Sequence, residues 1–197
     1  MKIGKELCVK TTTIALLVIL ATPRCFTEEL SLNCALSKGW SVSGSDCGSE
    51  VAISPANELT PVGEHCLSLR YHFKGENPKL SYCQYQLDKR HSFSLRVPQK
   101  MILWIKGDGK QHPIAIRFVD ENNRTHQWKI VYCCDWKGWR KIKFDLFFGK
   151  RGYNAWGGKS VKKIFSIRFF SFVIDKRLPG DDDRGTLLIG GIRLLNK

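Results

Sequence analysis

The stretch MILWIKGDGKQHPIAIRFVDENNRTHQWKI, residues 101–130, carries the pattern from which the fold class follows. Three short apolar runs, 101–106, 114–120 and 126–132, are separated by Gly-Asp-Gly and by Asp-Glu-Asn-Asn. Glycine, asparagine and aspartate are the residues that tight turns favour. Short runs rich in β-branched and aromatic residues and bounded by such turns predict antiparallel β-strands joined by hairpins.

The same spacing continues on both sides of this stretch. Further strands are expected at 67–73, 80–87, 139–148, 163–174 and 186–195. The run KIFSIRFFSFVI (163–174) is apolar on both faces, which is typical of a central strand. No segment has a sustained helical period with caps. The sequence therefore predicts an all-β domain, a β-sandwich or barrel, with loops at 149–162 and 175–185 long enough to carry function.

The first 27 residues have the pattern of a signal peptide. Basic residues precede an apolar run at Thr11–Ala21, which is about half of the roughly 20 apolar residues that a membrane-spanning helix needs. Cleavage is expected near 25–28, leaving one domain over 28–197. Lipid attachment at Cys25 is the alternative, although Pro23-Arg24 does not resemble the small residues that such a site requires. The expected location is secreted, periplasmic or in the cell envelope.

The composition is that of a globular and strongly basic protein. Of 197 residues, 43% are hydrophobic, enough to form a core, and the formal net charge is +14. Such charge favours an anionic partner. Basic residues gather in one stretch of the chain: Lys137, Arg140, Lys141, Lys143, Lys150, Arg151, Lys159, Lys162 and Lys163. Basic residues interleaved with aromatic rings also suit single-stranded nucleic acid, but the export signal argues against that partner. An anionic glycan or a cell-envelope surface is expected instead.

The cysteines and the missing motifs limit the chemistry. Outside the signal peptide lie six cysteines: Cys34, Cys47, Cys66, Cys83, Cys133 and Cys134. Export favours one or two disulfides among them, with the pairing left open, and the absence of a C-x-x-C pair argues against zinc. H-E-x-x-H, G-x-S-x-G and phosphate-loop motifs are absent, so we expect no enzyme. A glycan-active enzyme remains the alternative, and it would need two acids in one cleft, with Asp120 and Asp135 the first to consider.

Four motifs in order give the sequence a family resemblance. They are WIKGDG (104–109), R-F-x-D (117–120), D-W-x-G-W (135–139) and W-G-G (156–158). The chain resembles, over about residues 65–195, the galactose-binding-like jelly-roll domains attached to bacterial polysaccharide-processing proteins. The resemblance implies a two-sheet jelly roll that binds carbohydrate without catalysis.

The resemblance also raises the question of a structural calcium ion. Domains of this group often carry an aspartate in the last strand that helps to hold calcium, but this chain has Gly190-Gly191 there. Asp181–Asp183 could supply oxygen ligands, although an acidic loop is more commonly a solvated turn. We therefore expect no cofactor, with a structural calcium as the alternative.

Aromatic rings and planar hydrogen-bonding groups are what a sugar site needs. Tyr153 and Trp156 lie in the glycine-rich sequence R-G-Y-N-A-W-G-G, where a ring either anchors the loop or is exposed to bind a ligand. Trp128 could lie in the core or in a cleft, whereas mid-strand Trp104 is expected in the core. One ring of D-W-x-G-W is expected to plug the edge of the sandwich.

Arg117 is the strongest polar candidate, because it stands among apolar neighbours in IAIRFVD. A charged group on an inward face needs a partner. That partner would be Asp120 or another acid in a structural ion pair, or else a sugar hydroxyl pair or carboxylate. Arg168 has the same two interpretations and would join Arg117 in the floor of a groove. The predicted carbohydrate-binding residues are Trp156, Tyr153, Arg117, Trp128, Arg168 and Asp120.

Overall fold

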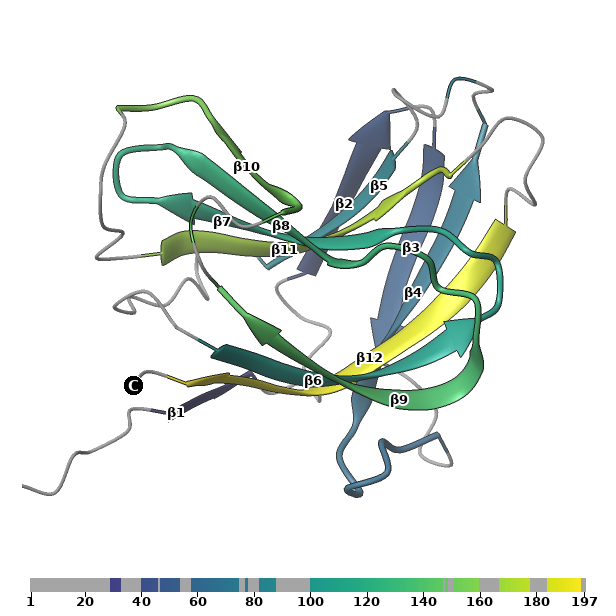
Figure 1. Cartoon of the computed structure of the whole chain (residues 1–197). Helices are drawn as coiled ribbons and strands as arrows, with labels where there is room; N and C mark the ends of the chain where they lie inside the picture. Colours follow the sequence, from purple (N-terminus) through teal and green to yellow (C-terminus); the bar gives the residue numbers. More distant parts are fainter. Residues whose placement is uncertain are drawn as a thin grey trace, which may run out of the picture.

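The protein folds into two antiparallel sheets that pack face to face (Figure 1). The computed structural model describes residues 29–32, 40–45, 47–53, 58–74, 77, 82–87, 100–146, 148, 151–159, 167–177 and 184–195. The signal-peptide region, Cys34, Asp181–Asp183, Lys150, Lys162 and Lys163 lie outside these residues. Within them, no helix is long and apolar enough to cross a membrane.

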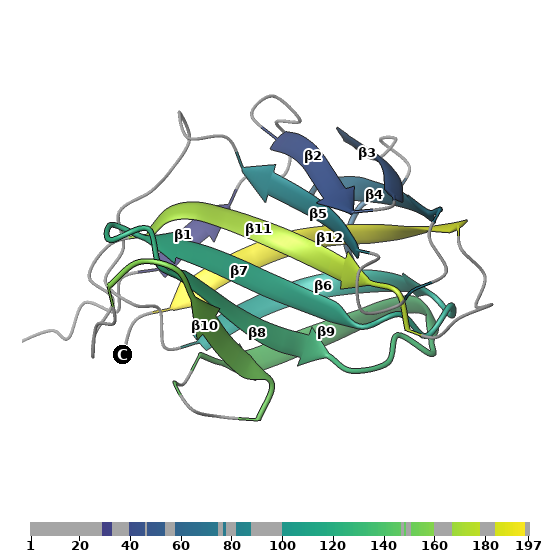
Figure 2. The same ribbon diagram turned by 90° about the horizontal axis from the view of Figure 1, so that it is seen from above.

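Each sheet contains six strands. Sheet A is formed, in order, by β3 (Cys47–Ile53), β4 (Cys66–Phe73), β12 (Arg184–Leu195), β6 (Lys100–Asp108) and β9 (Lys137–Asp145), and β1 (Glu29–Leu32) pairs with the second half of β12. Sheet B is formed by β10 (Tyr153–Trp156), β8 (Thr125–Val131), β7 (Ile114–Asp120), β11 (Ile167–Asp175), β5 (Tyr82–Leu87) and β2 (Trp40–Ser45). Figure 2 shows the strands of sheet B side by side, from β10 to β2, above those of sheet A.

The core is made by alternate residues from the inner faces of both sheets. In β6 these are Met101, Leu103 and Ile105, and in β7 they include Ile116 and Phe118, all buried. Because side chains alternate along a strand, each inward apolar residue is followed by one that points away from the core. The predicted all-β sandwich is confirmed, and so is the central position of β11, which lies between β7 and β5.

Strand prediction succeeded where apolar residues mark a strand and failed at some edges. Residues 114–120 are a strand as predicted. The sequence WSVSGS of β2 is too polar to stand out, and β10 lies in the glycine-rich stretch interpreted as a loop. Both are edge strands of sheet B. β2 pairs with β5 and β10 pairs with β8, and this pairing, not an apolar pattern in their own sequence, makes them strands.

Trp104 of β6 lies where it was not expected, whereas Trp136, just before β9, lies where one ring of D-W-x-G-W was expected. Trp104 was expected in the core, but Leu103 and Ile105 occupy the inward positions of β6, so Trp104 lies half-buried on the outer face. Trp136 is the ring of D-W-x-G-W that plugs the sandwich, and the guanidinium of Arg140 lies 4.6 Å from its ring centroid. A methyl group on Gly107 would lie 2.4 Å from the Trp136 carbonyl oxygen, so only glycine fits beside this plug.

Two of the cysteines, Cys133 and Cys134, are free thiols and not parts of a disulfide. Cys133 and Cys134 are not joined to another described cysteine. Burial raises the pKa of the Cys134 thiol to about 12, so it stays protonated and unreactive at neutral pH. Disulfide formation by the other cysteines stays a prediction.

Candidate functional site

The outer face of sheet B carries a row of hydrogen-bonding side chains. The strand registers align one polar residue from each strand: Asn154, Gln127, Arg117, Ser171, Gln86 and Ser41. Their inward-facing neighbours, such as Phe118 and Phe170, pack in the core. The row crosses all six strands, and its members other than the buried Ser171 offer donors and acceptors to a ligand that lies across the sheet.

Arg117 is the centre of the row and is held by two glutamines. Its Nε donates to Oε1 of Gln127, and its Nη1 donates to Oε1 of Gln84 at 2.6 Å. The amide of Gln84 in turn donates to Ser171 Oγ at 3.2 Å and to Gln86 Oε1 at 3.2 Å. The guanidinium is thus fixed by its neighbours before any ligand arrives, which lowers the entropic cost of binding.

Two aromatic rings flank this guanidinium. The Arg117 Cζ atom lies 5.1 Å from the ring centroid of Tyr82 and 5.3 Å from that of Trp156. Trp156 is 41% exposed, so its ring is open to solvent as well as to Arg117. The arrangement combines apolar ring faces with a planar cation, which are the groups that hold the C–H faces and the hydroxyl or carboxylate groups of a sugar.

These residues lie in a groove with a volume of about 550 Å³. In Figure 1 the edge strands β10 and β2 rise above the middle strands β7 and β11, on the side away from sheet A. The lining residues of the groove are Tyr82, Pro113, Arg117, Gln127, Lys129, Asn154, Trp156, Asp175, Lys176 and Arg177. A groove of this size can take a few sugar rings.

The charge in the groove is mainly positive. Arg117, Lys129, Lys176 and Arg177 line it together with one carboxylate, that of Asp175. Burial raises the pKa of Asp175, while Lys129 and Arg117 oppose that shift. Burial also lowers the pKa of Arg117 from its ordinary value, and Asp175 opposes the change. Arginine keeps its charge at neutral pH despite such a shift, so the groove has an excess of positive charge.

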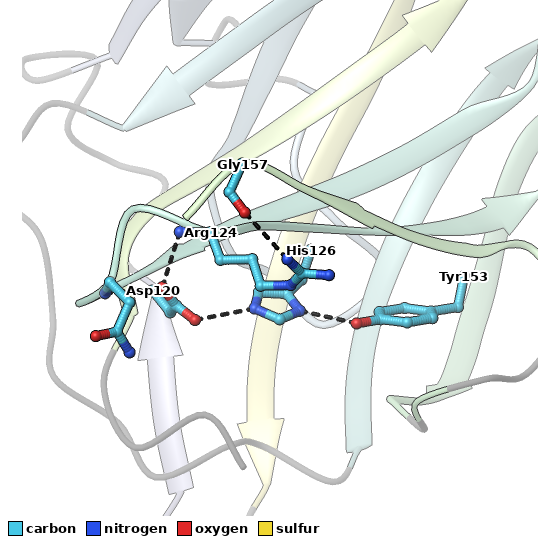
Figure 3. Close-up of polar contacts among 6 residues, drawn as sticks. Asp120, Arg124, His126, Tyr153 and Gly157 are labelled. Carbon is cyan, nitrogen blue, oxygen red and sulfur yellow. Dashed lines mark hydrogen bonds and ion pairs between the residues drawn. The ribbon is translucent and has the colours of Figure 1, made fainter. Parts of the chain in front are cut away.

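A buried polar chain lies under the strand that carries Trp156 (Figure 3). His126 Nε2 is 3.1 Å from Asp120 Oδ2, and His126 Nδ1 is 2.9 Å from the Tyr153 hydroxyl. A carboxylate only accepts, so Nε2 carries the proton and Nδ1 accepts from Tyr153. The other oxygen of Asp120 accepts the backbone N–H groups of Asn122 and Arg124, both at 2.9 Å. The chain fixes the β7–β8 turn and joins it to β10.

His126 makes the stability of this region depend on pH. Burial lowers the pKa of His126, although Asp120 opposes the shift. The unfolded chain therefore binds this proton more readily than the folded protein does. The neutral imidazole contributes stability above the unfolded-state pKa of about 6.5, and this contribution is lost as the pH falls through the lower folded-state pKa. We expect the melting temperature to fall between about pH 7 and pH 5, and His126→Asn to be less sensitive to acid over that range. Thermal unfolding at a series of pH values measures this.

The matched control is His65→Asn, because His65 is exposed. It should keep the acid sensitivity of the unchanged protein. An equal loss of melting temperature on acidification in the His126 variant and the unchanged protein would contradict the assignment.

The structure brings only two of the six predicted site residues into the groove, Arg117 and Trp156. Trp128 is 0% exposed and packs against Phe118 and Tyr153 in the core, so the core alternative for this ring is the one found. A surface ligand has no access to a ring in that position.

Asp120, Tyr153 and Arg168 are also placed away from the groove lining. Asp120 and Arg117 are three positions apart in one strand, so they point to opposite faces, and the alternative of an ion pair between these two residues is not found. Tyr153 points inward to His126. Arg168 donates to Asn123 Oδ1 at 2.7 Å, at the β7–β8 turn, and does not share a floor with Arg117.

Sequence reasoning missed Tyr82, Gln84 and Gln127. A signal for the first two was present in YCQYQL, where Tyr82, Gln84 and Gln86 alternate with the buried Cys83 and Tyr85. Such alternation places all three polar side chains on the solvent face of one strand. Gln127 alternates in the same way with the buried His126 and Trp128.

The last strand does not fit the calcium site that the resemblance implied. A methyl group on Gly190 would lie 2.6 Å from Cγ2 of Thr60 and 2.9 Å from Cβ of Cys66, so an aspartate has no room there. Gly191 has a φ of +59°, which also disfavours a side chain. The described residues contain no cluster of three histidine, cysteine or acidic side chains that could hold a metal ion. The alternative ligands, Asp181–Asp183, lie outside those residues.

Comparison with known proteins supports the fold. No protein-family model and no curated protein sequence matches this chain. A carbohydrate-binding module of the β-sandwich superfamily, described for its promiscuous specificity, superposes with a TM-score of 0.53 at 15% identity. That match covers 82% of this chain and 58% of the other, so this chain spans little more than half of that relative.

A second similar structure is matched over nearly its whole length. The family 11 carbohydrate-binding module of a cellulosomal cellulase of Clostridium thermocellum has a TM-score of 0.54 at 13% identity, with 87% of this chain and 95% of the other covered. Identities this low establish the fold and leave the ligand to be argued from the site. The chain therefore has the β-sandwich fold of these carbohydrate-binding modules, and the jelly-roll fold that its sequence resemblance implied is confirmed.

Proposed function

We propose that this protein binds a poly- or oligosaccharide in the groove on the outer face of sheet B. The observation that carries the proposal is the fixed guanidinium of Arg117 between the rings of Tyr82 and Trp156. A sugar ring stacks on the exposed Trp156, and its hydroxyl groups bond to the polar row that crosses the sheet. The sandwich holds these groups on paired strands, so the groove needs little rearrangement to bind.

The positive charge of the groove favours an acidic sugar. Lys129 and Arg117 act on the one carboxylate of the lining, that of Asp175, and the exposed Arg177 and the buried Lys176 also line the groove. A carboxylate or sulfate group on the ligand is attracted by this field and accepts from the planar fork of Arg117. The preferred ligand is therefore an anionic glycan, such as a chain that contains uronic acid.

The groove supports binding rather than hydrolysis. A glycosidase usually acts through two carboxyl groups across the scissile bond. Among the described lining residues Asp175 is the single acid, and Asp120 is occupied by His126 in the interior. Export through the signal peptide at 1–27, which leaves the domain 28–197 outside the cytoplasm, is part of the same proposal.

Removing the exposed ring should weaken binding without unfolding the protein. We expect Trp156→Ala to lower the affinity for an acidic oligosaccharide about fivefold, because stacking on an aromatic ring contributes about 1 kcal/mol. Tyr132→Ala is the matched control, since Tyr132 is 50% exposed and does not line the groove. Calorimetric titration of both variants measures the difference.

A glycan array of neutral and acidic oligosaccharides tests the proposal as a whole. Binding should be strongest to acidic members and should fall with Trp156→Ala. No binding to any member would instead fit an envelope interaction or structural protein that uses the same fold without a sugar site. Cleavage of a bound glycan would contradict the non-catalytic part of the proposal.

A further inference from the structure

The outer face of sheet A carries a second set of rings and cations, on the side of the molecule opposite the groove. Trp104 and Lys106 of β6 face Lys141 and Trp139 of β9, because the register pairs Trp104 with Lys141 and Lys106 with Trp139. Their strand neighbours Leu103, Ile105 and Ile142 pack in or against the core, so the four side chains point away from it. We call this set, together with Lys143, the Trp104 face.

The ring of Trp104 lies between a cation and a glycine. Lys141 Nζ lies 5.7 Å from the ring centroid of Trp104. A methyl group on Gly191 would lie 3.0 Å from Cδ1 of the same ring, so the glycine lets the indole lie against the bulge of β12. Diagonal neighbours on antiparallel strands are about 7–8 Å apart, which brings Trp139 near Trp104.

The charge of the Trp104 face is only partly neutralised. The segment 58–65 borders it and supplies Glu58, 3.1 Å from Lys106 Nζ, and Glu64, 3.5 Å from Arg193. Lys141 and Lys143 are exposed, and no acid among the described residues forms an ion pair with either. Two exposed cations beside two half-buried rings complement a polymer with regular negative charges and flat apolar faces.

We propose that the Trp104 face is a second binding surface, specific for sulfated or carboxylated polysaccharide chains. The choice of a polysaccharide rests on the proposed function, since one class of polymer then accounts for both faces. The two sites lie on opposite sheets, so one molecule binds two chains, or two parts of a long chain, and gains avidity. The well-exposed apolar side chains do not include any residue of the face, which argues against insertion into a bilayer.

Dextran sulfate tests the cations of the Trp104 face. We expect Lys141→Ser/Lys143→Ser to bind it about tenfold more weakly at low salt, and its affinity to depend less steeply on salt. The matched control, Lys74→Ser/Lys159→Ser, removes the same charge from exposed positions elsewhere and should bind within about twofold of the unchanged protein. The loss should be the same in a Trp156→Ala background. Equal binding by the two double variants would overturn the proposal.

Inorganic polyphosphate, which has charge but no sugar rings, tests the part played by the indoles. Trp139→Ala should weaken dextran sulfate binding about fivefold and leave polyphosphate binding unchanged, with thermal unfolding as the check on folding. An equal effect on both polymers, or none on either, would overturn the role of the ring.

Two further probes exclude other partners of the Trp104 face. Oligo-dT or anionic phosphatidylserine vesicles that bind more tightly than dextran sulfate, and lose binding on Lys141→Ser/Lys143→Ser, would overturn the choice of a polysaccharide. Leu59 and Val62 are exposed on the bordering segment, so Leu59→Ser/Val62→Ser would identify binding to vesicles. If short oligosaccharides fail to bind the groove while dextran sulfate still depends on Lys141 and Lys143, the proposed function is wrong and the Trp104 face stands.

Discussion

Replacing Arg117 by alanine is expected to weaken binding of an acidic oligosaccharide by between about tenfold and 150-fold. Hydrogen bonds to a charged group contribute about 1.5–3 kcal/mol, and the fork of Arg117 supplies such bonds at the centre of the groove. The change also leaves Gln84 and Gln127 without the cation that their side-chain oxygens accept from. Calorimetric titration with an acidic oligosaccharide and its neutral counterpart measures the loss.

Arg117→Lys separates the charge from the planar fork. Lysine keeps the positive charge but does not span Gln84 and Gln127, so we expect an intermediate affinity and a reduced preference for the acidic ligand. Thermal unfolding is the control for both variants. Unchanged affinity in the folded Arg117→Ala protein would show that the groove is not the binding site.

Trp128→Ala is expected to cost about 3–5 kcal/mol of unfolding free energy, the range for truncating a large aromatic residue in a core. Trp128 is completely buried and packs against Phe118, Phe148 and Tyr153. The cavity would lie under β10, the strand that carries Trp156. Denaturant unfolding measures the change.

The exposed Trp156 is the matched control for this prediction, because Trp156→Ala removes the same side chain from the surface. Its unfolding free energy should change by less than about 1 kcal/mol. A Trp128→Ala protein as stable as the Trp156→Ala protein would contradict the placement of Trp128 in the core.

The sequence predicted the class of fold because the strands between Lys100 and Val131 are short, apolar and bounded by turn residues. It did not predict which way Arg117 points. β7 is a central strand with apolar residues on both faces, since Ala115 and Val119 alternate with Ile116 and Phe118. The sequence of β7 therefore does not alternate between apolar and polar residues, and the Arg117 side chain, which stands among apolar neighbours, was interpreted as pointing inward.

Two further parts of the site, the strand that carries Trp156 and the position of Tyr82, could not be predicted from local sequence. Tyr153 and Trp156 stand three residues apart in what reads as a loop, yet pairing with β8 makes a strand, so one ring points inward and the other outward. The separation of Tyr153 from Trp156 follows from strand geometry that only long-range pairing creates. Tyr82, which lines the groove, lies in β5, and β5 joins sheet B by pairing with β11. Nothing in the sequence near Tyr82 indicates that pairing.

The most direct test of the account is an NMR titration of the isotope-labelled protein with a short acidic oligosaccharide. The side-chain N–H signals of Trp156 and Arg117 report on the groove, and those of Trp128 and Trp104 report on the core and on the opposite sheet. The account predicts saturable shifts of Trp156 and Arg117 with one shared affinity, while the buried Trp128 stays in place and any shift of Trp104 follows a separate affinity. Saturable shifts at other tryptophans with none at Trp156 and Arg117 would contradict it.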